Sequence, residues 1–149
     1  MEIKKIFDLT GHVVILTGAA GLLGSEYAKG LSQAGANVVL ADTNFLKCKK
    51  LAKTLSKKYD VDPLPVNLDV TNPKSIKQML NLVMKKYSKI DVLINNAIFP
   101  ETGKIKNTSF ENFPLDVWNK GIDVNLTGIF LCCQQVGKIM VKQKRGAII

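Results

Sequence analysis

The sequence predicts a doubly wound α/β fold, in which a parallel sheet is covered by helices on both faces. Three observations lead to this prediction. Short apolar segments alternate with longer helical segments along the 149 residues. The apolar segments are nearly uninterrupted, which is typical of strands buried on both faces of a sheet. Three glycines separate the first apolar segment from the first helix, and strands joined by helical crossovers run parallel.

The chain opens with a strand, a helix and a second strand. Residues 13–16 read VVIL and predict a short buried strand. The helix that follows extends from about residue 22 to residue 33. Gly35 is placed to end it, because glycine readily takes the left-handed conformation found after helices. Residues 37–41, within NVVLAD, predict the second strand.

The segment 45–59 predicts the second helix. Leu46, Leu51 and Leu55 recur at helical spacing, and lysines lie between them. We therefore expect the leucines to mark the buried face and the lysines to face solvent.

The next three elements are a strand, a helix and a strand. Residues 64–68, inside DPLPVNLDV, predict the third strand, with the prolines near its start, where a missing N–H is tolerated. Thr71 to Pro73 then reads as a helix start, because proline at the first helical position loses no hydrogen bond. That helix reaches residue 87, and IDVLINNA, residues 90–97, supplies the fourth strand.

The last part of the chain contains a loop, a long helix and a fifth strand. Residues 99–113 have loop composition, and Pro114 opens a helix that reaches about residue 142. The final residues, RGAII, begin an apolar strand that no helix follows. We therefore expect one domain over residues 1–149, incomplete at its C-terminus, because a buried parallel strand needs a covering helix.

The net charge of +9 raises the question of nucleic-acid binding. Twenty of the 21 basic residues are lysines, and Arg145 is the one arginine. Arginine has the planar fork that pairs with bases and phosphates, whereas lysines scattered along helices are typical of solvated faces. We therefore expect no nucleic-acid partner.

Cysteine, histidine and hydropathy patterns exclude further classes of protein. Cys48, Cys132 and Cys133 show no C-x-x-C spacing, and Cys132 and Cys133 fall in an apolar stretch typical of small packing residues. His12 is the one histidine, so the sequence predicts neither a metal site nor a histidine-based triad. No apolar run approaches the ~18 residues of a membrane span, and the N-terminus lacks a signal-peptide pattern. We expect a cytoplasmic protein without a membrane partner.

The segment TGAAGLLG, residues 17–24, joins the first strand to the first helix. A strand, a glycine-rich turn and a helix form a geometry that binds pyrophosphate. The reason is that N–H groups at a helix start are unpaired and the helix dipole adds positive charge there. Glycine permits positive φ and lets the backbone approach a phosphate. Taken alone, the glycines also fit a plain turn.

Asp42 ends the second strand, 24 residues after Gly18. In dinucleotide-binding folds, a carboxylate at about this offset accepts hydrogen bonds from ribose hydroxyls. Its negative charge would repel a 2′-phosphate, and Lys47 and Lys49 are the nearby cations. The combination predicts a dinucleotide cofactor, with NAD favoured over NADP.

Four motifs, in the right order, resemble those of the short-chain dehydrogenase/reductase family. They are TGAAGLLG, the LDV that contains Asp69 and Val70, the NNA of residues 95–97, and DVNLTGIF around Asn125. The resemblance covers nearly the whole chain. It implies a Rossmann-type fold and an NAD(P)-dependent oxidoreductase that moves hydride between nicotinamide and a small-molecule alcohol/carbonyl substrate.

The resemblance also implies roles for individual residues. The backbone of the glycine turn would hold the pyrophosphate, Asp69 and Val70 would flank the adenine, and Asn96 and Ala97 would lie along the cofactor. Asn125 would be a catalytic residue that helps to hold a water in a proton relay; bonding of Asn125 to its own helix backbone does not exclude that role. The implied cofactor-binding residues are Gly18, Gly21, Leu22, Leu23, Gly24, Asp42, Asp69, Val70, Asn96 and Ala97.

Two positions depart from the short branch of the family. Leu22 stands where the short branch has its middle glycine, so the spacing T-G-x-x-G-x-x-G matches the extended branch of sugar-nucleotide epimerases and dehydratases. Ile98 stands where the NNAG motif has glycine. The NNA and DVNLTG motifs are those of the short branch, which we favour. A fragment of an extended-branch enzyme is the alternative.

The family's proton-transferring Tyr-x-x-x-Lys motif does not occur in the chain. The residues four positions after the tyrosines are Leu31, Pro63 and Asp91. Because the family's Ser, Tyr and Lys follow the fifth strand, we expect them beyond Ile149 and expect residues 1–149 alone to be inactive. A non-catalytic dinucleotide-binding module that ends near residue 149 is the other interpretation.

The resemblance also bears on assembly. In the family, the long helix that contains Asn125 packs against its counterpart in another subunit, which implies a homodimer or homotetramer. The apolar run GIFLCC fits either such a contact or burial on the sheet.

Overall fold

The computed structural model describes residues 6–99 and 108–149. In this part of the chain, parallel strands form a five-stranded sheet in the order β3-β2-β1-β4-β5. The strands are β1 (Val13–Thr17), β2 (Asn37–Asp42), β3 (Leu64–Asn67), β4 (Val92–Ile94) and β5 (Ala147–Ile148). The predicted doubly wound α/β fold is confirmed.

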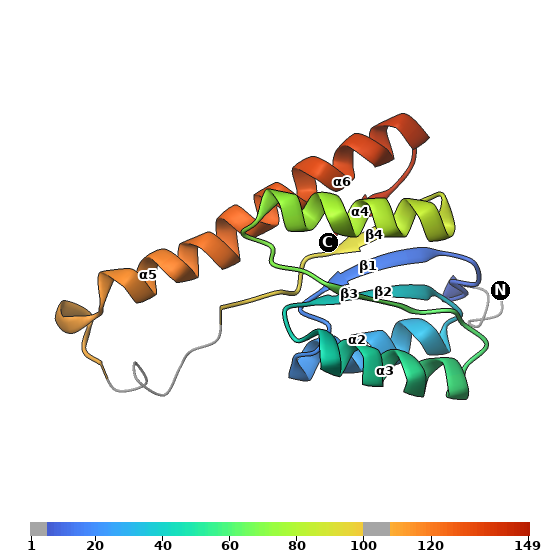
Figure 1. The fold of residues 1–149 in the computed structure, drawn as a ribbon, viewed down its shortest axis with the longest axis horizontal. Helices are drawn as coiled ribbons and strands as arrows, with labels where there is room; N and C mark the ends of the chain where they lie inside the picture. Colours follow the sequence, from blue (N-terminus) through green and yellow to red (C-terminus); the bar gives the residue numbers. More distant parts are fainter. Residues whose placement is uncertain (1–5, 100–107) are drawn as a thin grey trace.

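Helices connect the strands and cover both faces of the sheet, α2 and α3 on one and α4 and α6 on the other (Figure 1). The helices are α2 (Leu22–Gln33), α3 (Phe45–Lys58), α4 (Pro73–Tyr87), α5 (Leu115–Ile122) and α6 (Ile129–Gln143). A 3₁₀ turn, η1 (Phe110–Asn112), precedes α5, and a π-helical segment, η2 (Asp123–Gly128), joins α5 to α6.

Alternate side chains of β1 supply the two halves of the core. Val14 and Leu16 pack in the cluster that includes residues of α2 and α3, and Val13 and Ile15 pack in the cluster with residues of α4 and α6. All four are at most 1% exposed. Because successive side chains of a strand point to opposite faces, a strand covered on both sides must be apolar throughout, as VVIL is.

The buried face of α3 differs from the predicted one. Leu46 is 69% exposed, whereas Cys48, Ala52 and Leu55 are buried against the sheet. These three residues recur at spacings of four and three, so they share one helix face, and Leu46 lies outside that stripe. The lysines of α3 are exposed, as predicted.

The fourth strand is shorter than predicted. Its ladder covers Val92–Ile94 and not residues 90–97, and side chains bond the backbone further out on both sides. The Gln143 amide bonds the N–H and carbonyl of Ile90 at 3.0 and 2.8 Å, and the Thr17 hydroxyl accepts the N–H groups of Asn96 and Ala97.

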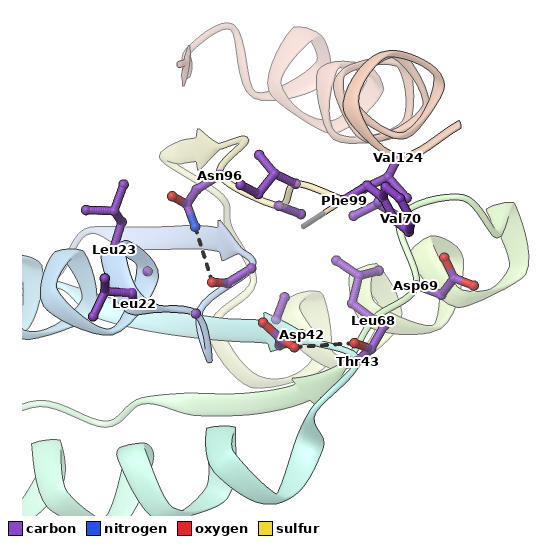
Figure 2. A pocket seen from close by; sticks show the side chains of 16 residues that line it. Leu22, Leu23, Asp42, Thr43, Leu68, Asp69, Val70, Asn96, Phe99 and Val124 are labelled. Carbon is purple, nitrogen blue, oxygen red and sulfur yellow. Dashed lines mark hydrogen bonds between the residues drawn. The ribbon is translucent and has the colours of Figure 1, made fainter. Parts of the chain in front are cut away.

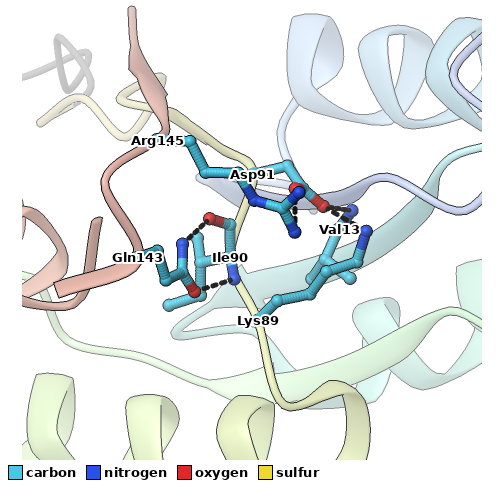
Figure 3. Close-up of polar contacts among 6 residues, drawn as sticks. All are labelled: Val13, Lys89, Ile90, Asp91, Gln143 and Arg145. Atoms are coloured by element: carbon cyan, nitrogen blue, oxygen red, sulfur yellow. Dashed lines mark hydrogen bonds and ion pairs between the residues drawn. The ribbon is translucent and has the colours of Figure 1, made fainter. Parts of the chain in front are cut away.

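Residues from three segments meet at the amino ends of β1 and β4 (Figure 3). One oxygen of Asp91 accepts the N–H of Val13 at 2.9 Å and pairs with Lys89 at 2.9 Å. The other oxygen lies 3.6 Å from the guanidinium of Arg145. Together with the hydrogen bonds between the Gln143 amide and the backbone of Ile90, these contacts fix the turn between α6 and β5 against the start of β4.

Helices α5 and α6 form one long rod with η2. By length and composition alone, Leu115–Gln143 would suffice to cross a membrane, and 22% of its apolar 18-residue window is buried in the structure. Its second half packs on the sheet through Cys132, Val136 and Met140. Its first half, α5, has no buried residue and extends beyond the sheet (Figure 1). Because α6 packs on the sheet, the second half of the rod is part of the α/β fold.

Candidate functional site

A cavity of about 590 Å³ lies at the carboxyl edge of the sheet (Figure 2). Loops that leave β1, β2, β3 and β4 meet there, which is where ligands bind in open parallel sheets. The residues lining it include every predicted cofactor-binding position: Gly18, Gly21, Leu22, Leu23, Gly24, Asp42, Asp69, Val70, Asn96 and Ala97. Asn125 does not line this cavity.

The glycines of the first turn are needed for conformation and close packing. Gly18 has a φ of +66°, and a Cβ added there would lie 2.8 Å from Cα of Ala97. A Cβ at Gly24 would overlap the carbonyl oxygen of Gly18, so the start of α2 packs directly on the turn. Both positions therefore exclude any side chain.

The start of α2 provides hydrogen-bond donors that face the cavity. The N–H groups of Leu22, Leu23 and Gly24 begin the helix, where no intrahelical carbonyl reaches them. Gly21 occupies the cap position without a side chain to accept them, and the first turn contains no acidic residue. This donor set fits a pyrophosphate, which would meet unpaired N–H groups and the positive end of the helix dipole.

Asp42 connects the glycine turn to the end of β2. One of its oxygens accepts the N–H of Ala20 at 3.0 Å, and the other accepts the N–H of Asn44 at 2.8 Å. The second oxygen also accepts the hydroxyl of Thr43 at 3.4 Å (Figure 2). The carboxylate is thus held at the cavity wall by neighbouring backbone, a contact that the sequence pattern did not reveal.

Asp69 and Val70 follow β3 on the far side of the cavity from Leu22 (Figure 2). Asp69 is exposed, and one carboxylate oxygen accepts both the N–H and the hydroxyl of Thr71, at 2.9 and 2.7 Å. Val70 packs against Gly128 of η2, where an added Cβ would lie 2.6 Å from Cγ2 of Val70. Gly128 therefore lets the long helix approach this wall, a role that the sequence did not indicate.

Thr17 and Asn96 tie the glycine turn to the loop after β4. The Thr17 hydroxyl accepts the N–H groups of Asn96 and Ala97 at 2.9 and 3.0 Å, and it donates to the carbonyl of Ile94. The Asn96 amide donates to the carbonyls of Thr17 and Gly18 at 3.0 and 3.2 Å. Asn96 therefore fixes the cavity wall at the glycine turn, and Thr17 is a supporting residue that sequence reasoning missed. The sequence signal for Thr17 is its position as the one polar residue at the end of an otherwise apolar buried strand.

Asn125 lies in η2, and its side chain contacts the loop after β4. Its side-chain carbonyl oxygen accepts the N–H of Phe99 at 2.7 Å. The side-chain oxygen of Asn125 therefore bonds a distant loop, whereas the alternative interpretation had it bonding the backbone of its own helix. Phe99 and Val124, which sequence reasoning also missed, complete the cavity wall on this side.

The cysteines provide packing. Cys48 and Cys132 are fully buried, and all three cysteines are free thiols. Burial raises the pKa of the Cys132 thiol to about 12, and that of Cys48 likewise to about 12. These two thiols stay protonated at neutral pH and are not nucleophiles, which agrees with the packing role predicted for Cys132.

The fold and the cavity at its carboxyl edge define a Rossmann-type α/β protein. The chain belongs to the short-chain dehydrogenase family: the family model described as short chain dehydrogenase matches residues 12–149. Enzymes of this family are oxidoreductases that use NAD(P).

Individual relatives support the same family. The chain is 34% identical over 144 residues to a 3-oxoacyl-[acyl-carrier-protein] reductase of Synechocystis, with 95% of the chain and 55% of that protein covered. It is 32% identical over 151 residues to an NADP-dependent mannitol dehydrogenase of Alternaria alternata, with 99% and 55% covered. A short-chain type dehydrogenase/reductase from Mycobacterium marinum superposes with a TM-score of 0.89 at 28% identity, covering 99% of this chain and 56% of its own. The chain thus spans about half the length of the curated relatives it matches.

Proposed function

We propose that this chain carries the cofactor-binding half of an NAD(P)-dependent oxidoreductase that interconverts an alcohol and a carbonyl compound. One observation carries the proposal: all ten residues predicted to bind the cofactor line a single cavity at the carboxyl edge of the sheet. They come from four separate segments of a chain that belongs to the short-chain dehydrogenase family.

The cavity suggests how the chain would hold the cofactor. The unpaired N–H groups of Leu22, Leu23 and Gly24 would bind the pyrophosphate, and Asp42 would accept the ribose hydroxyls. Asp69 and Val70 would flank the adenine. When bound, the nicotinamide would supply or accept the hydride, and the residues of this chain would orient it and exclude water.

Asp42 favours NAD over NADP in this proposal. Its carboxylate is anchored by the N–H groups of Ala20 and Asn44, so it cannot easily turn away from a 2′-phosphate. Asp42→Asn keeps an acceptor oxygen and removes the charge. We expect the ratio of NADP to NAD affinity to rise by at least about tenfold; an unchanged ratio would remove Asp42 from the ribose site.

Asn125 would support proton transfer near the reacting carbonyl. Its side chain holds Phe99, so it fixes the loop between the cofactor cavity and the long helix. We place the Ser, Tyr and Lys of the family in sequence outside residues 1–149, because the chain covers only about half the length of its relatives.

We also propose a cytoplasmic homo-oligomer that binds neither nucleic acid nor membrane. The rod formed by α5, η2 and α6 exposes large apolar side chains, including Trp118, Leu126 and Phe130 at 56%, 63% and 59%. Contact with a second subunit would cover this face, and sedimentation velocity tests it: a monomer at all concentrations would contradict the assembly.

The function is tested with the full-length protein, NADH or NADPH, and a panel of aldehydes and ketones. We expect carbonyl-dependent loss of reduced-nicotinamide absorbance. Cofactor binding without turnover would instead support a non-catalytic dinucleotide-binding module. A bound sugar nucleotide would support an extended-branch epimerase or dehydratase, and absence of both binding and turnover would refute the proposal.

A further inference from the structure

The solvent face of helix α3 carries positive charge and no negative charge. The helix contains six lysines and no acidic residue. Lys49, Lys50, Lys53 and Lys57 recur at spacings of three and four, so they share one side of the helix, and all four are exposed. We call these four lysines, together with the exposed Leu46, the basic face of α3.

The stability of the helix does not account for these lysines. Lys49 and Lys53, and Lys53 and Lys57, are like-charged pairs four residues apart, and each such pair destabilises a helix by roughly 0.2–0.5 kcal/mol. The helix dipole favours lysine in the last turn, where Lys57 and Lys58 lie, but not nearer the start. A helix face that is only solvated gains from a mixture of both signs, which α3 lacks.

Neighbouring segments leave the charge of this face uncompensated. Within residues 6–99 and 108–149, no carboxylate forms an ion pair with a lysine of α3. The ammonium group of Lys49 lies 4.6 Å from the centre of the Phe45 ring, which orients this lysine but does not neutralise it. Carboxylates supplied by another molecule would therefore meet ammonium groups that have no competing acidic partner in this part of the chain.

Leu46 adds an apolar group to the basic face. Its side chain is 69% exposed, and it lies three and four residues before Lys49 and Lys50, on the same side of the helix. Helix α3 begins shortly after Asp42 and Thr43, which line the proposed cofactor cavity. Leu46 therefore marks the end of the basic face that lies nearest to that cavity.

The basic face is remote from the surface proposed to contact a second subunit. Helices α2 and α3 cover one face of the sheet, whereas α6, which belongs to the long rod, covers the other (Figure 1). A molecule bound to α3 would therefore not compete with a second subunit bound to the rod.

We propose that the basic face of α3 is a docking surface for an acidic protein, whose helix presents carboxylates about one turn apart and an apolar side chain that meets Leu46. Complementary charge favours such a partner because it speeds association and fixes the register of the two surfaces. The inference goes beyond the proposed oxidoreductase function and does not depend on it.

Two other kinds of partner fit the basic face less well. Binding of a helix to a lipid surface requires a broad apolar face, and the apolar face of α3, with Cys48, Ala52 and Leu55, is buried against the sheet. Recognition of nucleic acid favours arginine, whose planar fork pairs with phosphates and bases, and α3 contains no arginine.

The test uses the full-length protein and a synthetic acidic peptide. The peptide is a fluorescein-labelled helix of about 18 residues, made of alanine, glutamates four residues apart and one leucine near one end. Fluorescence anisotropy at low ionic strength measures its Kd, because salt screens exposed charges. A second peptide has alanine in place of the leucine, and a third has glutamine in place of the glutamates and should not bind.

Two variants of equal charge separate the basic face from the net charge of the protein. The first combines Lys49→Gln, Lys50→Gln, Lys53→Gln and Lys57→Gln, and glutamine has a helix propensity close to that of lysine. The control changes four exposed lysines of α4 and α6 to glutamine: Lys74, Lys77, Lys85 and Lys142. We expect Kd for the acidic peptide to rise at least about tenfold in the first variant, because each exposed ion pair contributes up to about 1 kcal/mol. In the control, Kd should stay within about threefold.

Leu46→Ala gives a second readout that charge alone would not change. We expect Kd for the leucine-containing peptide to rise at least about threefold, because apolar contact area is lost, and Kd for the alanine peptide to stay the same. Both peptides act without cofactor or substrate, so failure of the proposed oxidoreductase function would leave this result intact. Circular dichroism and thermal unfolding show whether each variant is folded.

Several outcomes would overturn the inference. They are absence of binding by the acidic peptide, equal Kd values in the two lysine variants, or a Kd that ignores Leu46→Ala. Tighter binding to phosphatidylserine vesicles or to double-stranded DNA than to the peptide, lost in the basic-face variant, would give the surface to a membrane or to nucleic acid. Self-association that sedimentation velocity finds lost only in the basic-face variant would give it to a second copy of the chain.

Discussion

At the scale of single residues, the cavity is shaped by side chains that bond backbone groups of other segments. Thr17, Asp42 and Asn96 join segments of the carboxyl edge to one another, and Asn125 joins η2 to the loop after β4. Such bonds matter most where the backbone is buried, because a buried N–H without an acceptor costs more than an average hydrogen bond contributes. Thr17 is 1% exposed, and its hydroxyl accepts hydrogen bonds from two such N–H groups.

Thr17→Val keeps the shape of the side chain and removes its oxygen. The N–H groups of Asn96 and Ala97 then lose their acceptor, so we expect the free energy of unfolding to fall by about 2–4 kcal/mol. Urea unfolding measures the loss. Thr17→Ser retains the hydroxyl and should remain close to the natural protein; equal losses in both variants would show that packing and not hydrogen bonding explains the position.

At the scale of elements, the long helix is placed by one glycine and interrupted by one π-helical segment. Gly128 allows the helix to pack on Val70, and η2 turns Asn125 toward Phe99. Neither feature follows from periodicity, because residues 114–142 read as one continuous helix. The sequence motif pointed to Asn125, but its bonding partner depends on how two distant segments pack.

Gly128→Ala should destabilise the protein, because the added Cβ would lie 2.6 Å from a methyl group of Val70. Overpacking of this kind costs about 1–3 kcal/mol. Gly137→Ala is the matched variant in α6, where an added Cβ meets nothing within 4 Å, and it should stabilise by roughly 0.5–1 kcal/mol. Thermal unfolding distinguishes the two, and a shift of the same sign in both would contradict the packing described for Gly128.

The amino-end contacts of β4 predict acid sensitivity. Burial of the Asp91 carboxyl opposes its ionisation, but hydrogen bonds from Lys89 and the N–H of Val13, with the charges of Lys89 and His12, outweigh burial and lower its pKa below the usual 3.8. A lowered pKa in the folded state means that the carboxylate stabilises the fold fully above the unfolded-state value of about 3.9. This contribution is lost as pH falls through the lower folded-state value.

Asp91→Asn tests this linkage by denaturant unfolding at a series of pH values. We expect a loss of about 1–3 kcal/mol at neutral pH and a flatter pH dependence below about pH 5. A variant whose stability falls with acid as steeply as that of the natural protein would show that Asp91 is not a source of the acid sensitivity.

At the scale of the whole molecule, the alternation of apolar and helical segments was enough to predict the layered parallel fold. An uninterrupted apolar strand such as VVIL is typical of a parallel sheet that helices cover on both faces. The cavity was predictable because the carboxyl ends of parallel strands converge, so Gly18, Asp42, Asp69 and Asn96 had to meet. What could not be predicted was side-chain direction within elements: Leu46 faces solvent and Cys48 the core. The contacts of Thr17 and Gly128 depend on packing between remote segments.

The central claim is that the cavity at the carboxyl edge binds a nicotinamide dinucleotide. Titration of the full-length protein with NADH by isothermal titration calorimetry tests it most directly. We predict one site per chain, lost in Gly18→Val, because a Cβ at this position would lie 2.8 Å from Cα of Ala97. We predict retention in Gly11→Val, which has a similar φ of +75° but no atom within 4 Å. Absence of NADH and NADPH binding to the natural protein, or full binding by Gly18→Val, would contradict it.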